Sequence, residues 1–240
     1  MKTSILYLLI GLLLGVAAHA QQVKPEGMDA QNNLQNLASD VIGAPIRTFD
    51  ERYAGVKGSP YLLDKWQIGT LFYTKGQQRD NVKLKFNTYQ SEVEALREPK
   101  GDSVVVDRQT LQGFSLAQGP DGGPFIARKV PINGQPVFLE VVHEGKKGTL
   151  FCHHRQVLLK ANYKGAYNPG RTQDELIPEK DFYWANSTDA PQKIKPNKKG
   201  IAELFPKHAE ALDAFIKQEK IDLKERDGLR RLAAYLDTLP

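Results

Sequence analysis

Three adjacent residues, Cys152, His153 and His154, carry the side chains best suited to chemistry in this chain. Thiolate and imidazole are ligands that zinc prefers, and a thiolate is also a nucleophile. If residues 148–160 form a β-strand, adjacent side chains point to opposite faces of the sheet. Only Cys152 and His154 then share a face, so these two residues are the weak candidates for metal ligands.

The sequence offers little to complete such a site. Zinc sites use three or four ligands, and the remaining imidazoles suited to the role belong to His143 and His208. His143 lies across a predicted hairpin, near its turn and not opposite His154. Arg155, the nearest cation to the thiol in sequence, falls on the other face. We therefore expect a buried, unreactive Cys152 and predict neither a bound metal nor a cofactor. Which face of this strand belongs to the core stays open.

Catalytic motifs are missing from the sequence. It contains no G-x-S-x-G turn, no phosphate-binding G-x-x-x-x-G-K-[ST] loop and no dinucleotide fingerprint. If the protein were a hydrolase acting on envelope polymers, the best candidate catalytic residues would be Asp174, Glu175 and His154. Their spacing matches no diagnostic catalytic motif. An enzyme is therefore less favoured than a non-catalytic protein.

The first 20 residues resemble an export signal. Lys2 precedes an uncharged run of 12 residues, Ile5–Val16, and Ala18 and Ala20 stand at the positions that a signal peptidase reads. A spanning helix needs about 20 apolar residues, so cleavage before Gln21 is favoured over a membrane anchor. We expect an exported chain in the periplasm or at the cell surface, with no transmembrane segment after cleavage. Export also disfavours nucleic acid as a partner.

The rest of the chain divides into three segments. Residues 21–58 read as a flexible or partly helical lead-in. Residues 59–197 read as an antiparallel β domain of seven to nine short strands. Apolar and polar residues alternate with period 2 in Val82–Tyr89, which is typical of a strand, and turn sequences such as Gly119–Pro124 separate one strand from the next. Residues 198–240 carry apolar side chains at helical spacing. The fold expected is mainly β, a meander curled into a sandwich or half-barrel, with a C-terminal pair of α-helices packed on it.

Several short motifs resemble one family. The segments GSPYL, WQIGTLFY, VKLKFNTYQSEVEAL, VLLKANYKGAYNPGR and DFYW are similar to those of exported, β-rich proteins from Bacteroidota that carry no assigned function. The resemblance runs from about Gly55 to the C-terminus. It implies export and a β-rich body, and it implies no catalytic residue.

These observations favour a non-catalytic envelope module that binds a protein, a glycan or an anionic surface. Aromatic residues of the kind that anchor binding sites occur at Tyr163, Tyr167 and Trp184, although strand alternation favours a core position for Trp184. The alternatives are the hydrolase described above and a carrier that holds an apolar ligand inside a curled sheet. Nothing in the sequence predicts the oligomeric state.

Positive charge is concentrated near the end of the β domain. Basic residues exceed acidic ones by five between positions 143 and 200, and the densest cluster comprises Lys193, Lys195, Lys198 and Lys199. A solvated loop accounts for such a cluster. The more specific hypothesis is attraction to an anionic envelope surface, where each lysine contributes at most about 1 kcal/mol.

Overall fold

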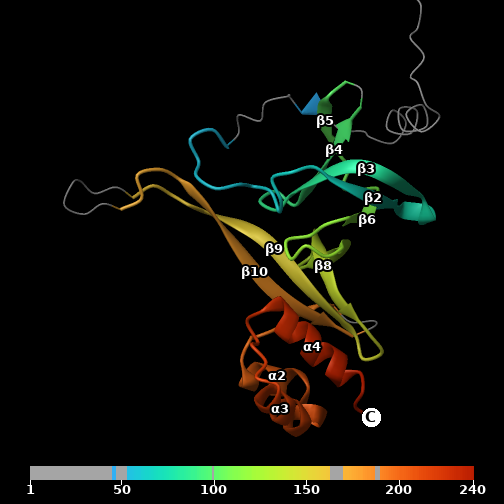
Figure 1. Cartoon of the computed structure of the whole chain (residues 1–240), viewed down its shortest axis with the longest axis vertical. Helices are drawn as coiled ribbons and strands as arrows, with labels where there is room; N and C mark the ends of the chain where they lie inside the picture. The colour runs from blue at the N-terminus through green and yellow to red at the C-terminus, as the bar shows by residue number, and fades with distance from the viewer. Residues whose placement is uncertain (1–44, 47–52, 99, 163–169, 187–189) are drawn as a thin grey trace, which may run out of the picture.

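The computed structural model describes residues 45–46, 53–98, 100–162, 170–186 and 190–240. The predicted signal and most of the lead-in lie outside these residues. The described chain forms one antiparallel sheet of 11 strands in the order β1-β5-β4-β3-β2-β6-β7-β8-β9-β10-β11 (Figure 1). The strands are β1 (Pro45–Ile46), β2 (Gln67–Tyr73), β3 (Gln78–Asn87), β4 (Glu92–Arg97), β5 (Asp102–Val105), β6 (Leu111–Leu116), β7 (Phe125–Ile132), β8 (Gln135–Glu144), β9 (Thr149–Leu159), β10 (Glu175–Ala185) and β11 (Gln192–Lys193).

The mainly β fold predicted from the sequence is confirmed. Alternation along β3 buries Val82, Leu84 and Phe86 while Lys83 and Lys85 point away, as period-2 patterning requires. The sheet stays open, with β1 and β11 at its edges. It has more strands than the seven to nine that the sequence indicated.

One face of strands β2 to β8 encloses the first hydrophobic core. The Phe114 side chain lies at its centre, with ring centroids 5.0 Å from Phe86, 5.5 Å from Phe138 and 5.9 Å from Phe125. Large aromatic side chains remove much apolar area from water, so the curled strands can close this core on themselves.

The segment that precedes β2 helps the sheet to curl. Lys57 pairs with Glu175 at the start of β10, and Tyr61 pairs with Asn87 at the end of β3, although β3 and β10 are not neighbours in the sheet. Gly58 allows this close approach, because its φ is +92° and a Cβ there would lie 2.5 Å from the Leu176 carbonyl oxygen.

A second core forms where three helices cover the same face at β8, β9 and β10. The helices are α2 (Lys198–Leu204), α3 (Ala209–Gln218) and α4 (Arg226–Leu236). The sequence predicted a pair of helices, whereas the described residues form three, because α2 ends at Leu204 and Pro206 starts a short 3-10 turn before α3. Their apolar faces pack on Leu150, Cys152, Phe182 and Trp184. None of the described helices has the length and apolar content to cross a membrane.

Candidate functional site

A cluster of buried polar side chains lies on the helix-covered face, between the two hydrophobic cores. Glu140 on β8 is directly opposite Cys152 on β9, and His154 follows two residues later on the same face. Only 3% of Glu140, none of Cys152 and 7% of His154 is exposed. The ring centroid of His154 is 5.7 Å from that of Phe125, which belongs to the first core.

Hydrogen bonds connect this cluster to helix α4. The two carboxylate oxygens of Glu140 have different partners, with His154 Nε2 2.7 Å from Oε2 and Arg226 Nε 2.7 Å from Oε1. Arg226 Nη2 is a second donor at 2.5 Å from Oε1. Asp121, on the loop before β7, has Oδ2 3.5 Å from Arg226 Nε and is 56% exposed, so the cluster has one side near solvent.

The electrostatics of the cluster follow from its burial and its pairing. Burial alone would raise the pKa of Glu140, but hydrogen bonds from His154 and Arg226 outweigh burial and hold that pKa below its ordinary value. Burial, together with the nearby Glu140 carboxylate, raises the pKa of the Cys152 thiol far above its usual range. In the absence of a bound metal ion, Cys152 is therefore a neutral thiol and not an activated nucleophile.

Two roles suit this arrangement. The Glu140–Arg226 pair links the sheet to α4, because Arg226 is the first residue of α4 and its guanidinium donates to the carboxylate of Glu140 on β8. Glu140, Cys152 and His154 also form a set of metal-ligating groups, since Cys152 Sγ, one ring nitrogen of His154 and one carboxylate oxygen of Glu140 all lie within 4.8 Å of one another.

A separate feature is found on the opposite face of β7 to β10. Phe151, Tyr183 and Leu139 are buried there at 6%, 8% and 0% exposure, with half-buried Val137 and Val141 packed beside them. Among the described helices, none contributes to this apolar cluster. The surface is instead hollowed into an open cleft of ≈ 610 Å³. We call this surface the open face.

The cleft on the open face combines an apolar floor with a charged rim. Phe151, Val130 and Ala185 contribute apolar surface. Arg128 and Glu144 form a double ion pair at its edge, with Nη1 and Nη2 2.7 and 2.6 Å from the two carboxylate oxygens. Ile126, two residues before Arg128 and on the same face, is 47% exposed.

The four lysines predicted as an anionic-surface site each lie near a carboxylate. The distances are 2.7 Å for Lys193–Asp181, 3.1 Å for Lys195–Glu203, 3.1 Å for Lys198–Asp213 and 3.9 Å for Lys199–Glu203. These neighbours offset the positive charge, so the cluster is less strongly basic in space than along the chain.

The aromatic candidates divide into two groups. Trp184 is 3% exposed and packs edge-on against Phe205 with centroids 5.1 Å apart, and its Nε1 donates to Asn186 Oδ1 at 3.0 Å. Trp184 is therefore a core residue of the helix-covered face. Tyr163 and Tyr167 lie outside the described residues, and their role stays a prediction.

The residues considered for hydrolysis are not brought together. Asp174 accepts hydrogen bonds from Lys160 Nζ and the Ala161 amide, both at 2.8 Å, and Glu175 pairs with Lys57. On β10 it is Lys180, not either acid, that lies opposite His154. Glu175 is five residues from Lys180, which corresponds to about 17 Å along a strand. His154 therefore cannot act together with Asp174 or Glu175 on one bond of a substrate.

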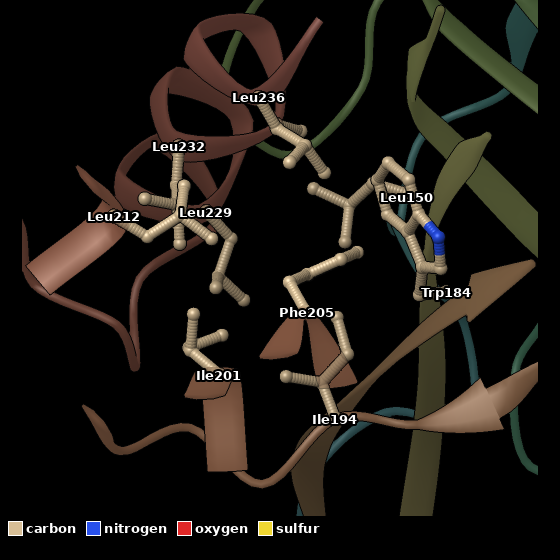
Figure 2. Close-up of a pocket in the computed structure, with 10 residues that line it drawn as sticks. Leu150, Trp184, Ile194, Ile201, Phe205, Leu212, Leu229, Leu232 and Leu236 are labelled. Carbon is tan, nitrogen blue, oxygen red and sulfur yellow. The ribbon is translucent and has the colours of Figure 1, made fainter. Parts of the chain in front are cut away.

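A small cavity remains between the helices and the sheet. Figure 2 shows it surrounded by apolar side chains from both layers, including Leu150, Trp184, Ile201 and Leu236. Its volume of ≈ 10 Å³ corresponds to about one water molecule, so this space cannot hold the apolar ligand of a carrier.

Two members of the buried cluster were not found by sequence reasoning. Glu140 is one carboxylate among many, and Arg226 is 72 positions after His154 in the chain. The only available signal was a charged residue inside the otherwise apolar run Val137–Val142.

The comparisons with known proteins gave no match: no family model, curated protein or solved structure is significantly similar to this chain.

Proposed function

We propose that this protein is an exported, non-catalytic module of the cell envelope, and that its open face binds an apolar segment of another envelope protein. The observation that carries the proposal is the cleft of ≈ 610 Å³, which lies within the volume range of known ligand sites, about 300–1,000 Å³. Export is supported by the N-terminal sequence Lys2 to Ala20.

The chemistry of the open face favours a protein partner. Protein interfaces combine an apolar centre with a polar rim. Here Phe151 and Val141 provide the apolar centre and the Arg128–Glu144 pair provides the rim. An anionic surface receives less support, because each lysine of the basic cluster has a carboxylate within 4 Å.

Capture from solubilised envelopes tests the proposal. The mature chain is used as bait beside two variants, Ile126→Arg on the open face and Ala234→Arg on the exposed side of α4. Both positions are exposed, so neither change should disturb the fold. We expect specific partners to be retained by wild type and Ala234→Arg and lost with Ile126→Arg. Equal retention by all three proteins would contradict an open-face site.

A further inference from the structure

The geometry points to a second, independent property: we propose that Glu140, Cys152 and His154 form a mononuclear zinc site at the junction of the sheet and helix α4. Each residue offers one ligand atom, and these atoms lie within 4.8 Å of one another. Sulfur, imidazole nitrogen and carboxylate oxygen are the donors that zinc accepts, at about 2.0–2.3 Å in tetrahedral geometry.

The backbone places the three donors without distortion. Glu140 and Cys152 face each other in the β8–β9 register, and His154 is the diagonal neighbour of Glu140 on the same face. Opposed residues have Cβ atoms about 4.5–5.5 Å apart, and diagonal ones remain within reach of long side chains. Small side-chain rotations are therefore enough to bring the three atoms onto one ion.

Arg226 leaves one carboxylate oxygen for the metal. Its guanidinium binds Glu140 Oε1, while Oε2 faces His154 Nε2 at 2.7 Å. A zinc ion would insert between Oε2 and Nε2, and Glu140 would be a monodentate ligand whose other oxygen stays hydrogen-bonded. Such outer hydrogen bonds orient the ligands in metal sites.

The charges of the cluster suit a divalent cation. On binding, the Cys152 thiol loses its proton to solvent, and His154 binds through Nε2 as the neutral tautomer that carries its proton on Nδ1. The site then holds Zn²⁺ with two anionic ligands and one neutral ligand, next to the positive Arg226 and the negative Asp121. The local charges sum to zero, so a buried ion would not be left uncompensated.

Access and the fourth ligand come from the same side of the cluster. Asp121 is 56% exposed and Arg226 is 21% exposed, so solvent approaches the cluster along the loop before β7. Three protein ligands leave one tetrahedral position, which a water molecule would fill.

Cobalt substitution tests the site without relying on activity. The untagged mature chain is refolded with one equivalent of Co²⁺, because the ligands are buried in the folded protein. We expect one bound Co²⁺ per chain, with the strong visible bands of four-coordinate cobalt and a thiolate-to-cobalt charge-transfer band that Zn²⁺ abolishes. A spectrum identical to that of hydrated Co²⁺ in the presence of folded protein would overturn the proposal.

Variants identify the ligands. Cys152→Ala should remove the charge-transfer band. His154→Gln should weaken the affinity for cobalt by more than about 100-fold, because loss of a hydrogen-bond partner outside the ligand set already weakens metal affinity about 10- to 100-fold. His208→Gln is the matched control, since His208 lies on the turn between α2 and α3 and should leave the spectrum unchanged. A band that survives in folded Cys152→Ala would contradict the site, with folding verified by circular dichroism.

X-ray absorption on the zinc-loaded wild-type chain needs no variant. The site predicts one sulfur at about 2.3 Å with lighter ligands at about 2.0–2.2 Å. A zinc shell without sulfur, or no bound zinc after refolding, would show that the cluster is only an ion-pair network that anchors α4.

Discussion

The two faces of β8 to β10 bury similar apolar side chains in different ways. On the helix-covered face, Leu150 and Trp184 are enclosed by α2, α3 and α4. On the open face, Phe151 and Tyr183 belong to an apolar cluster to which none of the described helices contributes, and Phe151 lines the cleft. A strand with apolar residues on both faces needs cover on both sides. The difference separates a face covered by helices from the face that we propose for a partner.

The largest expected effect comes from breaking the charged junction beneath α4. Glu140→Ala removes the partner of Arg226 and of His154, and Glu140 and His154 are themselves only 3% and 7% exposed, so we expect a loss of about 3–5 kcal/mol in the free energy of unfolding. Denaturant titration measures it. Glu203→Ala, which removes an exposed carboxylate paired with Lys195, is the control and should cost less than about 1 kcal/mol. Similar losses for the two variants would mean that the junction is not structural.

A pair of isoleucines compares the two faces directly. Ile201 is 1% exposed in the core beneath the helices, and Ile126 is 47% exposed on the open face. Ile201→Ala should lower the free energy of unfolding by about 2–5 kcal/mol, whereas Ile126→Ala should change it by no more than about 0.5 kcal/mol. Denaturant titration of both variants checks this, and a large loss at Ile126 would show that the open face is part of the core.

Acid should weaken the helix-covered face through Asp237, just after α4. Burial alone would raise its pKa, but hydrogen bonds from the Lys147 amide at 2.9 Å and from His143 Nε2 at 2.7 Å hold it below the ordinary 3.8. Because the folded pKa is the lower one, the stabilisation is complete above pH 3.8 and is lost as the pH falls through the folded value.

Asp237→Asn should therefore flatten the loss of stability below about pH 4, the region below the ordinary aspartate pKa. Unfolding measured across this acid range tests the expectation. If the variant and the wild type lose stability in parallel as the pH falls, Asp237 does not contribute to this acid sensitivity.

The smallest perturbation is chemical labelling of the single thiol. Cys152 is fully buried under the helices and its pKa is raised by burial, so native, metal-free protein should react slowly with a thiol reagent. The denatured chain should react rapidly. Labelling at the same rate before and after denaturation would contradict the position of Cys152 in the core.

Part of the fold could be predicted from the sequence. Alternation along residues 82–89 and the turn at 119–124 predicted an antiparallel sheet, because local periodicity and turn chemistry determine strands. The sequence left the core face of β9 undecided for a physical reason: Cys152 lies under helices and Phe151 lies in the cleft, so both faces are largely buried.

The polar cluster could not be predicted because it depends on a β-bulge in β8, which no local sequence pattern indicates. Strands β8 and β9 change register between Val141 and His143, so that Val142 is the extra residue and Glu140 lies opposite Cys152. With a regular hairpin, Val141 would occupy that position and Glu140 would point to the other face. Arg226 reaches the cluster only through tertiary packing of α4.

Site-specific photo-crosslinking in intact envelopes tests the central claim most directly, that the open face binds a partner and the helices serve the core. A photoreactive phenylalanine analogue replaces Ile126 on the open face or, as the matched position, Ala234 on α4. The account predicts discrete crosslinked species from position 126 and none from position 234. Adducts from position 234 alone, equal adducts from both positions, or none from position 126 would contradict it.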